Sequence, residues 1–476
     1  MDKNEGCKRR ILLTFAGNTD PTRGQHDGPI LHICRYYKPE KIYLILTEEM
    51  KLRDKKNNIY EEAIKENLKG YLPEIERVDT EIKDAHLFDG YFDILYNTFE
   101  KIKEKEKEAE ILVNLTSGTA QMTSNLIMYI IDSTDINIKG LQVSTPEKKS
   151  NTEKVVGIEY DIVLEAESNF DNLENSENRI IEPDLKRYSR VLIKNQIQEL
   201  LMQYKYTTCI QLLKRNVFNE NKELDILLNF ANDRKNLKGF ENYKKEGDIN
   251  RKLASLGHEK YNGLYYYKKD KKVFKVEKWY QIVDYFALAN IEAKSGNISK
   301  YILMLEPLSV NIYLSILEDV LEINLDNLFD KIKKNKYDSY VIKTSKLDSE
   351  LVEYIEKKGG IKGKLKDGNV SAAVLVSMIK YFLGKNGNRK MELSYIDNFS
   401  SLFFEIKDTR NDLAHALIQI NKKDFEVESK IKIENINKEI REFFKKYYST
   451  FGYKESMIYV YDKINRFVSE ILEREK

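Results

Sequence analysis

Apolar and polar residues follow two periods along the first part of the chain. Between residues 10 and 162, short apolar runs are separated by longer stretches in which apolar residues return every three or four positions. The short runs are typical of buried parallel strands, and the longer stretches are typical of the helices that connect them. The pattern predicts an α/β, Rossmann-like fold with strands at 11–15, 42–46, 111–115 and 138–143, helices at 29–36, 59–70, 91–106 and 117–131, and a further edge strand or hairpin at 154–162.

The pattern changes after residue 165. A polar, Asn-rich stretch at 165–182 ends at Pro183 and indicates a linker. Beyond it, apolar residues recur at helical spacing, and about 290 residues are long for a single helical core. We therefore predict a Rossmann-like domain at 1–165, a linker at 166–185, an all-α connecting domain at 186–278 and a second all-α domain at 279–476.

Composition and charge exclude several classes of protein. The 476 residues carry 79 Lys and Arg against 77 Asp and Glu, so the net charge of +2 provides no overall attraction for a polyanion, and we expect no stable DNA binding. No apolar run approaches the length of a membrane span, and the N-terminus is polar. Three scattered cysteines fit neither a disulfide framework nor a CxxC metal site. These features predict a cytoplasmic protein with no membrane partner.

Common cofactor motifs are missing. No GxGxxG follows the first predicted strand, and the glycine-rich stretch at 359–368 lacks the Lys-Ser/Thr of a phosphate loop. The five histidines include no HExxH pair and no neighbouring cysteine cluster. We therefore expect no nucleotide cofactor, no bound metal and metal-independent catalysis.

Two polar loops follow predicted strands. In an open α/β sheet, ligands bind outside the carboxyl ends of the strands, so both loops should face one pocket. Backbone N–H groups and hydroxyls at the second loop would suit phosphate oxygens, and side-chain amides would suit a base edge or a ribose. Turn formation and helix capping remain an alternative for the same residues. The first loop contains Gly17, Asn18, Thr19, Asp20, Thr22 and Arg23, and the second contains Thr116, Ser117, Gly118, Thr119 and Gln121.

These loops, together with Asp27-Gly28, Leu31-His32-Ile33 and the stretch at 37–41, resemble the N-terminal CARF domain of the type III-A CRISPR accessory ribonucleases. The resemblance implies a Rossmann-like sensor for a cyclic oligoadenylate, with His32 added to the loop residues as a ligand contact. It also implies a two-fold dimer, in which the binding surfaces of the two copies together match the symmetry of the ring. Cyclic hexa-adenylate is the first expected activator and cyclic tetra-adenylate the second.

The same resemblance bears on slow cleavage of the bound ring. Some members cut their ligand, and the counterparts here would be Asn18 and Thr116, which would orient a ribose 2′-hydroxyl for attack on its own phosphate. Relatives sometimes carry a histidine after the fifth strand. This chain has Thr-Pro-Glu-Lys-Lys at 145–149 instead, which leaves ring cleavage an open alternative.

A second candidate site contains Arg410 and His415. The Arg-x4-His spacing is common, and Arg251 with His258 forms a similar pair. Thr409 and Asp412 have the spacing of a capping box, which predicts that Arg410 is the first residue of a helix. Arg410 and His415 are separated by about 140° around such a helix, so one copy does not easily direct both side chains at one atom. Two copies across a dimer axis would.

Arg410-Asn411-x3-His415 resembles the Arg-polar-x3-His motif of HEPN ribonucleases, the C-terminal domain of the same CRISPR family. The resemblance implies a composite active site at a homodimer interface that cuts single-stranded RNA without a metal. The 2′-hydroxyl would attack the adjacent phosphate and leave a 2′,3′-cyclic phosphate and a 5′-hydroxyl. His415 would transfer protons, Arg410 would stabilise the charged phosphorane, and Asn411 would orient a neighbouring group.

We therefore predict a homodimeric endoribonuclease of CRISPR antiviral defence that a cyclic oligoadenylate activates. Two alternatives remain open. One is a ligand-sensing regulator or RNA-binding module with an inactive HEPN domain, in which the aromatic and basic stretch at 265–272 would contact RNA. The other is a constitutively active HEPN toxin with a degenerate sensor.

Overall fold

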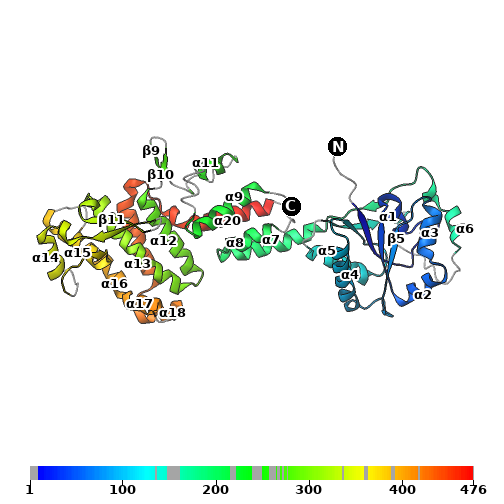
Figure 1. Cartoon of the computed structure of the whole chain (residues 1–476), viewed down its shortest axis with the longest axis horizontal. Helices are drawn as coiled ribbons and strands as arrows, with labels where there is room; N and C mark the ends of the chain where they lie inside the picture. The colour runs from blue at the N-terminus through cyan, green and yellow to red at the C-terminus, as the bar shows by residue number, and fades with distance from the viewer. Residues whose placement is uncertain are drawn as a thin grey trace. The chain divides into compact units, whose positions relative to one another are not determined.

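The computed structural model of the chain divides into two compact units. The first comprises Met1–Ile197 and Gln211–Glu220, and the second comprises Gln198–Ile210 and Asn221–Glu475. Each unit is considered by itself below (Figure 1). The structure describes residues 9–133, 137–146, 161–214, 221–238, 249–256, 264, 268–270, 273–275, 277–334, 337–358, 363–386, 392–415 and 419–474.

A six-stranded sheet forms the centre of the first unit. Its strand order is β5-β4-β1-β6-β7-β8, in which the first five strands run parallel and β8 pairs antiparallel with β7. The four predicted strands are confirmed within one residue at either end. The strands are β1 (Arg10–Phe15), β4 (Lys41–Leu46), β5 (Glu74–Asp79), β6 (Glu110–Asn114), β7 (Ile138–Val143) and β8 (Ile180–Ile181).

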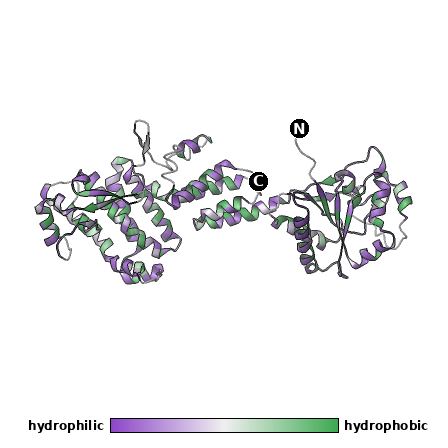
Figure 2. Cartoon of the chain, in the orientation of Figure 1, coloured by the Kyte–Doolittle hydropathy of each residue, from purple (hydrophilic) through white to green (hydrophobic). Residues whose placement is uncertain are grey.

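Helices cover both faces of this sheet, because alternate residues of the buried strands point to opposite sides. One face packs Ile11, Leu13 and Phe15 of β1 against α4 and α5. The other packs Leu12 of β1 with β4 residues against α1, α2 and α3. The helices are α1 (Pro29–Tyr37), α2 (Glu48–Asn57), α3 (Ile59–Asn67), α4 (Phe92–Lys105) and α5 (Ala120–Asp132), and Figure 2 shows hydrophobic and hydrophilic residues interleaved along helices of both units.

Strand β5 was not predicted, because its sequence Glu-Ile-Glu-Arg-Val-Asp carries four charges in six residues. It is an edge strand whose residues are exposed or partly buried. Ile75 packs on one face of the sheet and Val78 on the other, and the backbone pairing with β4 and ion pairs such as that of Lys41 with Glu76 also hold the strand in place.

The segment at 166–185 is not the linker that we predicted. It packs against the first unit through α6 (Ile162–Glu167), a 3-10 turn at Phe170–Asn172 and β8. Its asparagines make specific contacts: Asn169 is buried and donates hydrogen bonds to Asp27 and Asn67. Residues 154–160 of the further predicted strand lie outside the described residues, and Ile162 begins α6 instead.

The second unit is mostly helical, but it is not all-α as predicted. The C-terminal helix α20 (Val460–Arg474) packs beside α9 (Lys222–Lys235), so helices from both predicted helical domains share one unit. The predicted boundary near 278 falls at the start of α12 (Lys278–Lys294). The other helices of eight or more residues in the described part are α7 (Lys186–Met202), which runs from the first unit into the second, α8 (Tyr206–Leu213), α13 (Ile298–Ser315), α14 (Ser349–Lys358), α15 (Ala372–Asn386), α16 (Leu393–Glu405), α17 (Lys407–His415), α18 (Lys422–Ser429) and α19 (Ile433–Phe443).

Short antiparallel strands account for the difference from an all-α unit. β9 (Lys268–Asp270) pairs with β10 (Val273–Lys275), and β11 (Phe329–Lys334) pairs with β12 (Tyr337–Ile342), which also pairs with β13 (Gly368–Asn369). β9 and β11 are rich in Lys and β13 has only two residues, so the strand signal was weak. Residues 265–267, 271 and 272 of the aromatic and basic stretch lie outside the described part.

Among the residues that the structure describes, one helix is long and apolar enough for a membrane span by length and composition. It joins α13 to a π-helical turn and covers Ile298–Val320. Of its most apolar 18-residue window, 67% is buried inside the protein, which is also typical of a core helix.

Candidate functional site

The two loops that follow β1 and β6 lie against each other in the first unit, and the ligand pocket that we predicted for them stays a prediction. A Cβ atom built on Gly17 would lie 2.7 Å from the backbone nitrogen of Gly118, so only glycine permits this approach. Gly118 itself has φ +97°, a left-handed conformation that glycine adopts easily. The close contact brings the carboxyl ends of both strands to one surface.

Asp20 holds this arrangement together. Its carboxylate accepts hydrogen bonds from the backbone N–H of Gly17 at 3.1 Å and of Ile30 at 3.0 Å, and it is also hydrogen-bonded to the Ser117 side chain. Asp20 is fully buried. Burial raises its pKa from 3.8 to about 6, and the hydrogen bond with Ser117 partly opposes that rise. Asp20 and the buried Ser117 therefore join the two loops to α1 rather than face a ligand.

The remaining loop residues differ in how much of them is accessible. Asn18 and Gly118 are exposed, while Thr19, Thr116 and Gln121 are partly buried. Asn18 and Gly118 are therefore the most accessible of these predicted site residues. Thr22 is buried with its hydroxyl on Glu165, Thr119 caps α5 and donates to the carbonyl of Ala85, and Arg23 is partly buried in the short strand β2 (Thr22–Arg23).

Thr116 and Asn114 are tied to the neighbouring strands. The Thr116 hydroxyl accepts a hydrogen bond of 2.8 Å from the backbone N–H of Val143, at the end of β7. Asn114 is buried, and its amide donates to the hydroxyls of Thr14 and Ser117. We did not single out Asn114 as a site residue. The sequence did contain a signal for it, because Asn114 is a polar residue at the end of the otherwise apolar run at 111–113 of β6.

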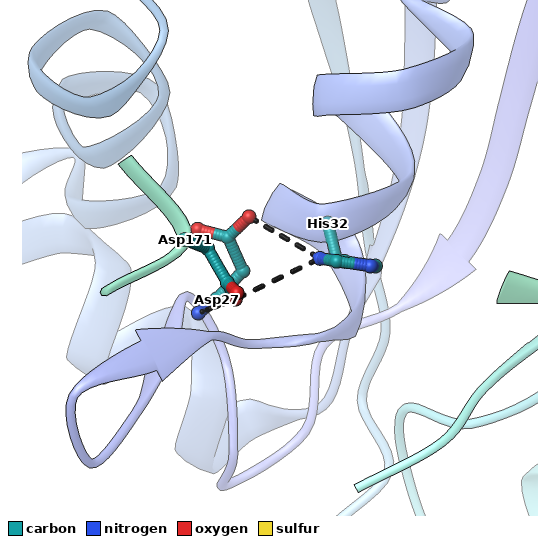
Figure 3. Close-up of side chains that lie close together, drawn as sticks. All are labelled: Asp27, His32 and Asp171. Atoms are coloured by element: carbon teal, nitrogen blue, oxygen red, sulfur yellow. Dashed lines mark hydrogen bonds and ion pairs between the residues drawn. The ribbon is translucent and has the colours of Figure 1, made fainter. Parts of the chain in front are cut away.

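His32 lies in a different environment from the loop surface. Its side chain is fully buried in a cluster with Asp27 and Asp171, and both carboxylates point toward the ring (Figure 3). The backbone N–H of Arg179 donates to Nε2 of His32 at 3.0 Å. We had predicted that His32 lies with the loop residues as a ligand contact. The structure instead buries it away from them, where it anchors the segment after β7.

Asp27, His32 and Asp171 have the donor atoms of a metal site, but two arginines already neutralise the carboxylates. Arg35 binds both oxygens of Asp27, at 2.6 and 2.9 Å, and Arg179 binds Asp171 at 2.6 Å. Burial by itself would raise the pKa of Asp27, but Arg35 and His32 lower it to about 2. A cation here would have to displace both guanidinium groups, so the cluster is better explained as a structural ion network.

In the second unit, the predicted start of the helix that carries Arg410 is wrong. Helix α17 begins at Lys407, and the N–H of Arg410 already donates to the carbonyl of Ile406. Thr409 is buried inside the helix rather than at its start. The capping-box pattern was misleading because Ile406 continues the chain almost directly from α16 into α17.

Arg410 makes two charged or polar contacts. Its Nη1 lies 2.7 Å from Oε1 of Glu306 on α13, and its Nη2 donates to Oδ1 of Asn411 at 2.6 Å. The Arg410 side chain is 19% exposed. It lines a cavity of about 140 Å³ together with residues of α13, α15 and α16. The guanidinium is thus held at the cavity wall by its contacts with Glu306 and Asn411.

His415 is the last residue of α17. Its side chain lies outside the described part of the structure, so the predicted pairing with Arg410 stays a prediction. The similar pair, Arg251 and His258, also cannot be compared: Arg251 lies in α11 (Ile249–Ala254), and His258 is outside the described residues.

Comparisons with known proteins agree with this two-part architecture. The family model described as the Cas_Csm6 CARF domain matches residues 74–180, and that described as the Cas_Csm6 HEPN domain matches residues 267–469. Together they cover more than half of the chain.

Named relatives and a solved structure match as well. A Streptococcus thermophilus protein, "CRISPR system endoribonuclease Csm6'", is 28% identical over 68% of this chain and 75% of its own length. An Enterococcus italicus "CRISPR system endoribonuclease Csm6" is 30% identical over 45% of this chain and 51% of its own length. The structure "Enterococcus italicus Csm6 bound to cyclic hexa-2'-fluoro-hexa-dAMP" shares the fold with a TM-score of 0.71 and 21% identity, covering 97% of this chain and 100% of that one. The chain therefore belongs to the Csm6 family, with a CARF domain followed by a HEPN domain.

Proposed function

We propose that this protein is a cyclic-oligoadenylate-activated endoribonuclease of type III-A CRISPR antiviral defence that cuts single-stranded RNA. The observation that carries the proposal is Arg410, fixed at a cavity wall on α17 within the region that matches the HEPN model. His415 lies five positions later on the same helix. The relatives named as CRISPR endoribonucleases support the activity.

The proposed chemistry needs no metal. The 2′-hydroxyl of the RNA attacks the adjacent phosphate, and His415 transfers the protons, since the ordinary pKa of histidine near 6.5 suits both directions. Arg410 stabilises the negative charge that develops on the phosphorane, and Asn411 orients its guanidinium through the hydrogen bond described above. The products are a 2′,3′-cyclic phosphate and a 5′-hydroxyl.

The proposed sensor is the loop surface of the first unit. Asn18, Gly118 and the start of α5 offer an amide and backbone N–H groups to the phosphates and riboses of the ring. The E. italicus neighbour is described as bound to a hexameric analogue, which favours cyclic hexa-adenylate as activator and leaves cyclic tetra-adenylate second. Slow ring cleavage would use Asn18 and Thr116. The Thr116 hydroxyl accepts a hydrogen bond from the N–H of Val143, so its own hydrogen remains available for donation to the ring.

The proposed assembly is a homodimer in the cytoplasm, without stable DNA binding. A second copy would supply the second Arg410 and His415 of a composite site, which the angle of about 140° within one helix favours. Cys34 and Cys209 are buried and form no disulfide among the described residues, in keeping with a reducing compartment.

The test is cleavage of a fluorescent single-stranded RNA in EDTA, with and without cyclic hexa-adenylate or tetra-adenylate. We expect one ring to activate the enzyme, and Arg410→Ala and His415→Ala each to lower the rate at least about a hundredfold. Arg466→Ala and His86→Ala, which remove exposed side chains, are the matched controls. Ring binding without cleavage would indicate a ligand-sensing regulator, and strong cleavage without a ring would indicate a constitutive toxin.

A further inference from the structure

The cavity beside Arg410 has an aromatic wall that no other ring covers. Phe404, near the end of α16, is 39% exposed and has no aromatic partner within the described part of the chain. Its neighbour Phe403, by contrast, packs edge-on against Tyr313 and Phe399 in the core. Exposed aromatic faces of this kind are the platforms on which unpaired nucleic-acid bases stack.

The same cavity offers groups that suit a phosphate. Lys407 is exposed and has no carboxylate partner among the described residues. On another wall, Ser371 precedes the fifteen-residue helix α15, and the first two residues of that helix, Ala372 and Ala373, line the cavity. The Ser371 hydroxyl accepts from the N–H of Val374, whereas the N–H groups of Ala372 and Ala373 have no partner within the helix, and the positive end of the helix dipole favours an anion there.

The ion pair that Arg410 makes also indicates that an anion can bind at this cavity. Glu306 places a carboxylate on Arg410 at the cavity wall, and the side chain of Glu306 is 50% exposed. An RNA phosphate has the same charge and the same ability to accept two hydrogen bonds from a guanidinium, so it can take over this contact.

These walls come from four helices that pack together, α13, α15, α16 and α17 (Figure 1). We propose that this cavity is a nucleotide subsite for the RNA substrate, in which a base next to the scissile bond stacks on Phe404 and its phosphate contacts Lys407 and the start of α15. The inference rests on the proposed function, because it takes Arg410 as the marker of the cleavage site.

The test measures binding separately from cleavage. The full-length protein is titrated with a fluorescent single-stranded RNA whose 2′-hydroxyls are methylated, so that it binds but is not cut. Phe404→Ala should weaken binding about tenfold. Lys407→Ala should reduce the slope of log K against log salt by about 0.7, the value expected for one lost phosphate contact on a single strand.

Matched controls use residues of the same unit outside the cavity. Phe451 is 38% exposed, and Lys423 is exposed on α18. Phe451→Ala and Lys423→Ala should leave affinity and salt dependence unchanged, and thermal melting confirms that all four variants are folded. Unchanged binding in both cavity variants would overturn the subsite even if Arg410→Ala abolished cleavage. Failure of the wild-type protein to bind the methylated RNA would also overturn it. Normal binding of the methylated RNA, together with no ring-activated cleavage of the same RNA without the methyl groups, would contradict only the proposed function.

Discussion

Single residues at the loop surface have roles that their sequence positions did not reveal. Asn18 and Asp20 are two positions apart, yet one is exposed and the other is fully buried. The sequence places both in a loop after a strand, where polar side chains usually face solvent or a ligand. The burial of Asp20 depends on its contact with α1 and on Ser117, which lies far away in the sequence, so local pattern cannot predict it.

The buried carboxyl of Asp20 should make the stability of the protein depend on pH. Its pKa is near 6 in the folded chain and near 3.8 when unfolded, so the unfolded state gives up its proton first as the pH rises. The protein should therefore lose stability between about pH 4 and pH 6 from this group, by at most about 3 kcal/mol.

Thermal unfolding of the wild type and of Asp20→Asn from pH 4 to pH 8 measures this effect. The melting temperature of the wild type, relative to that of the variant, should fall as the pH rises through 6. A difference in melting temperature that stays constant over the whole range would show that Asp20 has the same pKa in both states.

At the scale of elements, strands and helices with strong apolar periodicity were predictable, and segments fixed by polar contacts were not. β1, β4 and β6 are buried runs, β7 is buried at four of its six positions, and all four were found from the sequence. The stretch at 166–185 has little apolar content, so its composition indicated a linker. Asp171 and Arg179 instead fix it to Asp27 and His32, through contacts between positions more than 130 residues apart.

Removal of Asp171 should loosen this segment. Asp171→Ala leaves Arg179 buried without its carboxylate, and breaking one partner of a buried ion pair costs about 3 kcal/mol or more. Asp184→Ala removes an exposed partner of Arg190 and should cost less than about 1 kcal/mol. Urea unfolding of the two variants provides the comparison. Equal losses for both would mean that the buried network does not stabilise the fold.

At the scale of the whole molecule, the proposed activation requires that the two ligands affect each other equally. If ring binding at the CARF domain tightens RNA binding by some factor, uncleavable RNA must tighten ring binding by the same factor. Isothermal titration of the ring, with and without saturating methylated RNA, measures that factor. We expect about fivefold or more. Identical ring affinities in both titrations, alongside ring-activated cleavage, would place the coupling in the chemical step rather than in binding.

The edge strand β5 limits how copies of this protein can join. A free sheet edge normally recruits another strand through its unpaired N–H and C=O groups, but charged side chains on the edge oppose such pairing. β5 presents Glu74, Glu76, Arg77 and Asp79, and the opposite edge of the sheet is the two-residue strand β8. A continuous intermolecular sheet is therefore disfavoured at both ends, which protects the concentrated protein from edge-to-edge aggregation. In the proposed dimer, we therefore expect the CARF domains to meet through helices and loops rather than through this sheet.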